Sequence, residues 1–473
     1  MTIETMTTLN SSAQLINNPE AAVTALKNSE DEGVRYYAAW WLGKNRILKA
    51  IPLLCECLKD ERDRTTLGGY PLRRQAARSL GMLKDSQAVT PLIEALDCSD
   101  LRLQEAVILA LKNIGDRSAI PALINLLNPE IKDKPTEALI EALTAFKVWE
   151  VQDHIEPFLQ DSSERVKCAA AQYFYALTLK PRYLEMLFQT LGHENRFLRY
   201  AAAMDLAALG RFEIAPAIIK AQIPNNIKLA TIKRILEALL QNKTEREVKR
   251  QEQANFLFPA LDELLLDAIQ GNIPRSNTVE TNQKIEKMKM LVAQQSITSQ
   301  QVPKSLILEL IEAVKSPYPN VKAAAIQGLV ELAPLSADVI IEVFDTDEDQ
   351  DLRAGLTQAL MYIGDLRTVS LLEKVIGFDI SDHCQGKIRR VAARGLGKIG
   401  RQTKNQEVIA QVIEKLKWAL LEPTDWALRY SAVVSLEEIG NSDGILALQA
   451  ASESESDFIV QTRIERALTA IGW

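Results

Sequence analysis

The sequence predicts an all-α protein in which pairs of helices stack into an α–α superhelix, or solenoid. One motif recurs along the 473 residues: an aliphatic residue, then a polar or basic one, with small residues three and four positions after it and a Leu at about seven. Successive copies begin mostly about 31 to 40 residues apart, and no strand-like alternation separates them. One hairpin cannot bury its apolar face alone, whereas stacked hairpins bury a continuous core. This pattern is typical of HEAT- and armadillo-like repeats.

The motif also marks where the helices begin and end. Between its copies lie second helices such as Ala50–Leu54 and Ala119–Ile124, each with Pro in the first turn, where a missing N–H costs nothing. Gly115 and Gly364 follow Ile and predict helix ends. Weaker copies lie near Thr136 and Leu229, and the clear copies begin at Val34-Arg35, Leu72-Arg73, Leu103-Gln104, Val166-Lys167, Leu198-Arg199, Val321-Lys322, Leu352-Arg353, Ile388-Arg389, Leu428-Arg429 and Val460-Gln461.

The regularity of the repeats divides the chain into three segments. We expect N-terminal repeats with the candidate site at 13–240, an irregular helical insertion or hinge at 241–301, and C-terminal repeats at 302–473. The middle segment is rich in Gln, Lys and Glu but holds apolar runs at Phe256–Ile269 and Ile285–Val292. It predicts two irregular helices and a loop. A hinge and a tolerated surface insertion both fit this composition.

Composition limits the classes of function. The chain is 47% hydrophobic and 25% charged, with a net charge of −7, which argues against a nucleic-acid-binding protein. It shows no signal peptide and no apolar run near 18 residues, so we expect a cytosolic protein that does not insert into a membrane. Five cysteines at irregular spacing make a disulfide framework improbable.

The residue types of metal and nucleophile sites occur without the partners that such sites need. Cys55 and Cys57 are two apart, so on a helix they point in different directions, and we expect no metal site. His383-Cys384 are adjacent and lack a third member, which favours a polar loop over a catalytic pair. Gly68-Gly69 is not followed by Lys and Ser or Thr, so the loop is not a P-loop. This longer loop, Arg62–Pro71, is instead placed to fold over a ligand.

Two successive inner helices carry an unusual pair of surfaces. Tyr36 and Trp40 lie four residues apart, opposite the apolar face of the first helix, and Arg74 and Arg78 occupy the same places in the next helix. Aromatic rings suit a π-system and arginines suit carboxylates, so we expect a pocket for a flat anionic ligand. The alternative, in which Trp40 packs under a loop and the arginines are solvated, remains open.

The same two positions in other repeats should face the concave surface, where solenoids bind their partners. Near the C-terminal end, Asp425 is either an N-cap with Trp426 as a hydrophobic staple, or a group that contacts a ligand, with Tyr430 stacking on it. The residues expected at the concave surface in other repeats are Glu105/Leu109, Tyr200/Met204, Arg390/Arg394 and Tyr430/Val434.

Three stretches of sequence resemble the E/F-type phycobilin lyases, and more the E-type member. They are Arg35–Gly43 (RYYAAWWLG), Gly68–Arg78 (GGYPLRRQAAR) and Asp425–Val434 (DWALRYSAVV). The length is more similar to the phycoerythrin-directed lyase of this family than to the phycocyanin-type E subunit, which works with an F partner. The segment 241–301 departs from the family pattern.

The resemblance implies an enzyme that attaches a phycobilin, phycoerythrobilin or phycocyanobilin, to a cysteine of an apo-phycobiliprotein subunit, expected to be α. The pigment is then the substrate, no cofactor is expected, and the reaction belongs in the cyanobacterial cytosol near phycobilisomes. A second lyase subunit is a further candidate partner. Open alternatives are a non-catalytic scaffold for phycobilisome proteins, and a lyase-isomerase with His383-Cys384 as its acid and base.

This resemblance also assigns candidate roles to residues of the three stretches. Arg74 and Arg78 would clamp the propionates of the pigment, and Asp425 and Tyr430 would contact pyrrole nitrogens or assist protonation. The acceptor subunit is expected along the remaining concave surface, on Tyr200, Arg390 and Arg394. The remaining candidates for contact with the pigment are Tyr36, Tyr37, Trp40, Trp41 and Trp426.

Overall fold

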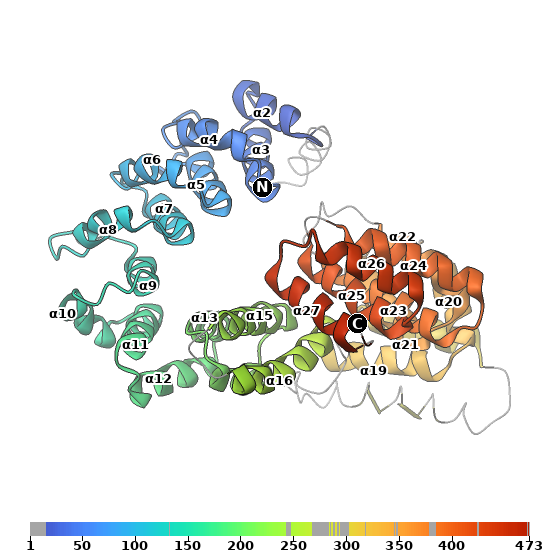
Figure 1. Cartoon of the computed structure of the whole chain (residues 1–473). Coiled ribbons are helices and arrows are strands. Elements are labelled where there is room, and N and C mark those ends of the chain that lie inside the picture. The colour runs from blue at the N-terminus through green and yellow to red at the C-terminus, as the bar shows by residue number, and fades with distance from the viewer. Residues whose placement is uncertain are drawn as a thin grey trace. The chain divides into compact units, whose positions relative to one another are not determined.

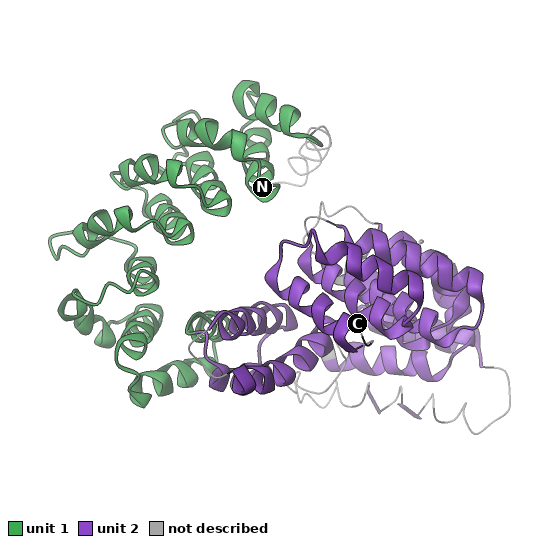
Figure 2. Ribbon diagram, viewed as in Figure 1, with its two compact units in different colours: residues 1–209 green, residues 210–473 purple. Residues whose placement is uncertain are grey.

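The computed structural model describes residues 16–266 apart from 132 and 243–246, isolated residues between 283 and 293, and residues 302–472 apart from 317, 345, 347–348, 378–384, 423–424 and 471. Helices joined by turns make up this part of the chain (Figure 1), which confirms the predicted all-α fold. Within it, no helix has both the length and the apolar character needed to cross a bilayer. The chain divides into two compact units, Met1–Leu209 and Gly210–Trp473, shown in separate colours in Figure 2.

Unit 1 consists of helix pairs in which the second helix of each pair packs on the second helix of the next. The packed series is α3, α5, α7, α9, α11 and α13. The helices of unit 1 are α2 (Pro19–Asn28), α3 (Glu32–Lys44), α4 (Ile51–Cys57), α5 (Pro71–Leu83), α6 (Val89–Glu94), α7 (Leu101–Ile114), α8 (Ile120–Leu126), α9 (Thr136–Ala145), α10 (Gln152–Ile155), α11 (Glu164–Thr178), α12 (Pro181–Leu191) and α13 (Arg196–Ala208).

Unit 2 repeats this arrangement with the packed series α19, α21, α23, α25 and α27. Before this series the chain forms α14 and α15, and then α16, which packs on α15, α23 and α25. The helices of unit 2 are α14 (Ala215–Lys220), α15 (Asn225–Gln241), α16 (Glu247–Leu266), α18 (Lys304–Val314), α19 (Pro319–Glu331), α20 (Leu335–Val343), α21 (Gln350–Ile363), α22 (Val369–Ile376), α23 (Gln385–Gln402), α24 (Gln406–Leu420), α25 (Trp426–Ile439), α26 (Ser442–Ser452) and α27 (Phe458–Ala470).

The small residues of the motif let neighbouring helices approach closely. Ala38, Ala39, Ala76 and Ala77 are fully buried between α3, α5 and their neighbours. A Cβ added at Gly43 would lie 2.6 Å from Cβ of Ser79 on α5, so only glycine fits there without a shift. The motif therefore specifies the distance between successive inner helices as well as their apolar faces.

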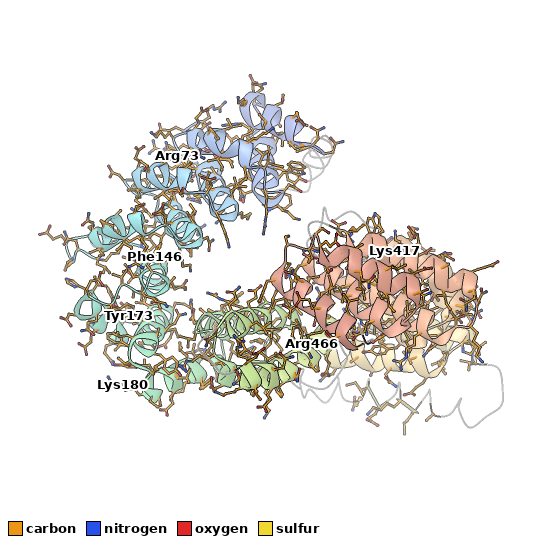
Figure 3. The ribbon with its side chains drawn as sticks, in the orientation of Figure 1. Arg73, Phe146, Tyr173, Lys180, Lys417 and Arg466 are labelled. Atoms are coloured by element: carbon orange, nitrogen blue, oxygen red, sulfur yellow. The ribbon has the colours of Figure 1, made fainter. Side chains whose placement is uncertain are left out.

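The polar second residue of the motif has a structural role that the sequence analysis did not assign. Its side chain reaches back to the carbonyl oxygens at or just after the end of the first helix of the same pair. These oxygens lack partners within that helix. Arg73, labelled in Figure 3, donates from Nε to the carbonyl of Asp60 at 2.7 Å. The other described examples are Arg35 to Leu26, Gln104 to Leu96, Arg199 to His193, Lys228 to Ile219, Arg389 to Ile376 and Arg429 to Glu422.

Helix ends follow the expected signals. Gly115 and Gly364 have left-handed φ angles of 80° and 70° and end α7 and α21, as predicted. Pro52 and Pro121 lie in the first turns of α4 and α8. Two strong local rules, glycine after a helix and proline at its start, therefore set these boundaries.

The middle of the chain is organised differently from the expected three segments. The described part of 241–301 includes α16, which is built into unit 2: Ala254, Leu257, Phe258, Leu261 and Leu265 are buried. We expected a boundary near 240, whereas the compact units divide between residues 209 and 210. The reason is that α15 packs on both α16 and α27, which groups it with the C-terminal repeats. The predicted loop from Gly271 to Ser276 lies outside the described residues.

Candidate functional site

The aromatic face of α3 is available at the surface of unit 1. Tyr36 is 37% exposed, and Tyr37, Trp40 and Trp41 are half-buried. The rings of Tyr37 and Trp40 pack with their centroids 5.3 Å apart, and the Lys44 ammonium lies 4.7 Å from the Trp40 ring centroid. Trp40 is therefore part of an aromatic cluster at the surface and does not lie in the core.

The opposite side of α3 is held in place by a buried arginine. Arg35 is 2% exposed; its Nε donates to the Leu26 carbonyl and its guanidinium pairs with Asp60. Burial alone would raise the pKa of Asp60, but hydrogen bonds from Arg62 and Arg35 outweigh it and hold that pKa well below its usual range. This pair fixes the rotation of α3 and so decides which of its residues reach the surface.

On the neighbouring helix α5, Arg74 is engaged by a carboxylate of the next repeat. Its Nε and Nη2 each donate to Asp100 at 2.8 Å. Asp100 is buried, caps α7 through the N–H groups of Arg102 and Leu103, and also accepts the N–H of Tyr70 at 3.1 Å. The expectation that Arg74 clamps a ligand is therefore corrected: one edge of its guanidinium is already used to join α5, α7 and the loop.

The Arg62–Pro71 loop closes on this carboxylate. Thr65 and Gly69 exchange two hydrogen bonds of 2.9 Å, one from the Thr65 N–H and one to its hydroxyl, which makes the loop compact. A Cβ at Gly69 would overlap the Arg74 guanidinium, so the glycine lets that side chain pass. The stretch Gly69-Tyr70-Pro71 thus has a structural explanation, because it seats the loop on Arg74 and Asp100.

Arg78 is the exposed guanidinium of α5. Helices α3 and α5 touch directly, since Ser79 Oγ on α5 donates to the Ala39 carbonyl on α3 at 2.7 Å. Neighbouring helices of unit 1 therefore present aromatic rings on α3, with Lys44 beside them, and the exposed Arg78 on α5. This arrangement suits a flat, apolar ligand that bears a carboxylate.

Two of the C-terminal candidates, Asp425 and Trp426, lie half-buried at the start of α25. Asp425 Oδ1 accepts the N–H groups of Ala427 and Leu428 at 3.1 Å, so it is the N-cap of α25. Trp426 is half-buried; the Lys233 ammonium lies 4.8 Å from its ring centroid. Capping explains Asp425 fully, and the alternative ligand role is not needed to account for it.

Tyr430 does not face an open surface, contrary to expectation. It is 0% exposed, and its hydroxyl donates to Asp262 Oδ1 on α16 at 2.6 Å. Burial raises the pKa of Tyr430 well above its ordinary value, and the Asp262 carboxylate adds to this rise. A ligand cannot stack on this ring while α16 covers it. Val434, expected beside it at the surface, is also buried.

The remaining candidates lie on α13 and α23. Tyr200 is half-buried and packs edge-on against Phe197, which is 63% exposed. Arg390 is half-buried, while Arg394 is only 8% exposed and pairs with Glu438 on α25. His383-Cys384 lies outside the described residues.

The described thiols are not prepared for nucleophilic attack. Burial raises the pKa of Cys57 to about 11, and it also raises the pKa of Cys55, Cys98 and Cys168. A thiol with a raised pKa holds its proton at neutral pH and attacks slowly. The described thiols are therefore poor candidates for the nucleophile.

Comparisons with known proteins identify the family. The model of HEAT repeats matches residues 70–144 and 378–469, and the model of the PBS lyase HEAT-like repeat matches residues 34–60. The chain is 52% identical over 268 residues to the bilin biosynthesis protein PecE of Mastigocladus laminosus, which covers 54% of this chain and 97% of PecE. The chain belongs to the E/F-type bilin lyase family.

Two further relatives of this bilin lyase are informative. It is 40% identical over 260 residues to phycocyanobilin lyase subunit alpha of Nostoc sp. (strain PCC 7120), covering 52% of the chain and 94% of that protein. It is also 47% identical over 152 residues to PecF of Mastigocladus laminosus, covering 32% of the chain and 72% of PecF. Each of these alignments thus accounts for about half of the lyase or less.

The sequence analysis missed the acids that complete the framework of this lyase. Asp60 and Asp100 come a few residues after the short helices α4 and α6, and the signal that could have identified them is their position 25 and 26 residues after their partners Arg35 and Arg74. Asp262 had no comparable signal, because it lies 168 residues before Tyr430 on a helix outside the regular repeats.

Proposed function

We propose that this bilin lyase attaches an open-chain tetrapyrrole, phycoerythrobilin or phycocyanobilin, through a thioether to a cysteine of an apo-phycobiliprotein subunit. The observation that carries this proposal is the 52% identity to PecE over 97% of the length of PecE. Membership of the lyase family is established by that match. The pigment, the acceptor cysteine and the assignment of the acceptor as an α subunit belong to the proposal.

The proposed reaction is redox-neutral and has no leaving group. The acceptor thiolate adds to the exocyclic ethylidene carbon of the first ring, a C–S bond forms as the π bond of that C=C is lost, and a proton is added to the carbon of the same ring that shared the double bond. The lyase contributes by orienting the pigment and excluding competing attack. This role fits a surface on which the Tyr37 and Trp40 rings pack together beside the Lys44 ammonium.

Unit 1 provides the surface that we assign to the pigment. Tyr36, Tyr37, Trp40 and Trp41 on α3 would lie against the pyrrole rings, with Lys44 at their edge. A propionate would pair with Arg78, which is exposed on the adjacent helix. Arg74 would act indirectly, by holding α5 and the loop to Asp100.

We assign the C-terminal candidates a smaller part in pigment binding than the aromatic residues of α3. Trp426 remains a candidate contact, and Asp425 remains a candidate proton acceptor through Oδ2, because its capping hydrogen bonds are accepted by Oδ1. Tyr430 is left out of the proposed site because α16 covers it. We propose Tyr200 and Arg390 as contacts of the acceptor subunit.

A second candidate concerns the partner subunit. The relatives include PecE and phycocyanobilin lyase subunit alpha on one side and PecF on the other, and each aligns with only part of this chain. The PecE and PecF matches cover 54% and 32% of this chain, lengths that a single polypeptide with an E-like and an F-like part would accommodate, and we propose that such a chain acts without a separate second subunit. We place the reaction in the cyanobacterial cytosol, near the phycobilisomes.

One co-expression experiment tests these proposals. The lyase is produced with a bilin and an apo-phycobiliprotein α subunit, and the acceptor is denatured and separated by electrophoresis. Colour that stays on the acceptor supports the lyase, and its appearance without an added second subunit supports the single-chain candidate. Absence of covalent colour would favour a non-catalytic scaffold. An absorption maximum shifted from that of the supplied bilin would identify a lyase-isomerase.

A further inference from the structure

Unit 2 contains a helix pair with the same framework as the α3–α5 pair of unit 1. On α25, Ser435 Oγ donates to the Ala393 carbonyl of α23 at 3.0 Å, as Ser79 does to Ala39. A Cβ at Gly397 would overlap Ser435, as one at Gly43 would overlap Ser79. By this correspondence Arg394 on α23 takes the place that Trp40 has on α3.

A cavity lies at this place in unit 2. Its volume is about 490 Å³, and residues of α16, α21, α23 and α25 line it. Leu266 and Met361 supply apolar wall, and Tyr362 also lines the cavity, with its carbonyl bound by Lys398. This volume lies within the range of about 300–1,000 Å³ that is usual for small-molecule sites.

Positive charge is in excess in the cavity. Its cations are Arg394, Lys398 and Arg401, at successive turns along one face of α23, and its carboxylate is that of Glu438. Lys398 Nζ donates to the carbonyl of Tyr362, and no ion pair among the described residues involves Lys398 or Arg401. Burial lowers the pKa of the Lys398 ammonium, the direction expected when a cation lacks a nearby anion.

The Arg394 side chain is held by two residues of α25, and one of its N–H donors has no hydrogen bond in the described structure. Its Nη1 donates to Ser435 Oγ at 3.0 Å and its Nη2 to Glu438 Oε1 at 2.6 Å. Its Nε is buried and forms no hydrogen bond within the described part of the chain. Glu438 therefore neutralises Arg394, whereas Lys398 and the exposed Arg401 have no carboxylate partner among the described residues, and an anion in the cavity would balance their charge.

We propose that this cavity is a second binding site for the carboxylates of the open-chain tetrapyrrole, located wholly within unit 2. The apolar wall would receive part of the ring system, and Lys398 and Arg401 would hold a propionate, with Arg394 fixed behind them by Glu438. The inference rests on the proposed function for the identity of the ligand. An acidic surface of the acceptor protein is the competing source of carboxylate, but a hollow that combines an apolar wall of Leu266 and Met361 with the cations of α23 favours a small molecule with both ring and carboxylate.

Chemical footprinting locates the site without any substitution. The full chain is treated with an amine-acylating reagent in the presence and absence of phycocyanobilin, and the modified lysines are counted by mass spectrometry. We expect at least fivefold protection of Lys398 and none of the nearby exposed Lys404, which does not line the cavity. If the pigment binds to the chain but leaves Lys398 unprotected, this inference fails while the proposed function stands.

Paired variants and a modified pigment give the second test. In a titration that resolves two sites, the affinity of phycocyanobilin for the unit 2 site should fall about tenfold in Lys398→Gln/Arg401→Gln and stay unchanged in Lys404→Gln, with the helical circular dichroism signal retained in both. The dimethyl ester, which lacks propionate charge, should bind the double variant and the unchanged chain equally. Equal weakening of acid and ester, or protection of Lys398 by the acceptor subunit alone, would overturn the inference. Failure of the pigment to bind at all would overturn the proposed function as well.

Discussion

The pairs α3–α5 of unit 1 and α23–α25 of unit 2 share a framework but differ in the residues they present. In both, an arginine at the second motif position is 1–2% exposed and reaches a carbonyl and a carboxylate: Arg35 pairs with Asp60, and Arg389 with Glu422. In both, a serine of the second helix binds a carbonyl of the first. The repeat therefore fixes backbone positions and leaves the surface positions open to different chemistry.

The two positions on each helix that we expected at the concave surface carry different side chains in the two pairs. The first helix has Tyr36 and Trp40 in unit 1 but Arg390 and Arg394 in unit 2, and the second helix has Arg74 and Arg78 in unit 1 but Tyr430 and Val434 in unit 2. In unit 2, α16 also covers the second helix, so Tyr430 binds Asp262. The comparison teaches that a repeat position predicts a direction, whereas exposure depends on what else packs there.

The largest expected effect comes from removing the carboxylate that ties the unit 1 pair to its neighbour. Asp100→Asn should destabilise unit 1 by about 3–4 kcal/mol, because it leaves a half-buried Arg74 without its anion. Hydrogen exchange of α5 peptides, measured by mass spectrometry, should rise while that of α25 peptides stays unchanged. Asp97→Asn, in the same loop but exposed, is the matched control.

The loss of stability in Asp100→Asn should depend on pH. Burial alone would raise the pKa of Asp100, but hydrogen bonds from Arg74 and from backbone N–H groups outweigh it and lower the pKa below the ordinary 3.8. The stabilisation is therefore present above pH 3.8 and is lost as the pH falls through the lowered value. The difference between the unchanged chain and Asp100→Asn should shrink below about pH 3.8; a difference that grows on acidification would contradict this assignment.

Removing the aromatic surface of unit 1 should affect the reaction more than the fold. Tyr36→Ala/Trp40→Ala should slow pigment transfer about five- to 150-fold, because two ring contacts of about 0.5–1.5 kcal/mol each are lost. The readout is the initial rate of colour formation on the denatured acceptor. Trp418→Ala, at a residue of unit 2 that is 44% exposed, should leave the rate unchanged. Equal rates in both variants would remove α3 from the site.

The shared framework predicts matched losses in the two units. Gly43→Ala and Gly397→Ala should each destabilise their own unit by about 1–2 kcal/mol, since the added methyl group overlaps a serine of the next helix. Thermal unfolding and exchange of the local peptides measure the loss. The pairs Gly43→Ala/Ser79→Gly and Gly397→Ala/Ser435→Gly should recover part of it, and recovery in only one unit would show that the correspondence is incomplete.

The smallest effect is expected for the exposed guanidinium. Arg78→Gln should weaken binding of a pigment with free propionates by less than about fivefold, because an exposed ion pair contributes about 0.2–1 kcal/mol. Titration of pigment absorbance against protein concentration measures it. The dimethyl ester serves as the control, since its affinity should not respond to the charge at this position.

The sequence by itself determined the repeat, the all-α fold and the family. Small residues at fixed spacing, Gly115 and Gly364 after their helices and the proline starts are local signals, so their structural consequences could be predicted. The aromatic surface at Tyr36 and Trp40 was predictable for the same reason, because it depends on one helix and its angular spacing.

Only the tertiary structure decided which of the predicted site residues are accessible. Arg74 and Tyr430 occupy the expected helix face, but Asp100 from the next repeat and Asp262 from α16 bind them. Asp100 lies one repeat after Arg74, 26 residues away, whereas Asp262 lies 168 residues before Tyr430 and no repeat pattern relates that pair. The physical reason is that a helical period fixes the direction of a side chain, while burial and pairing are set by neighbours that pack against it from elsewhere in the chain.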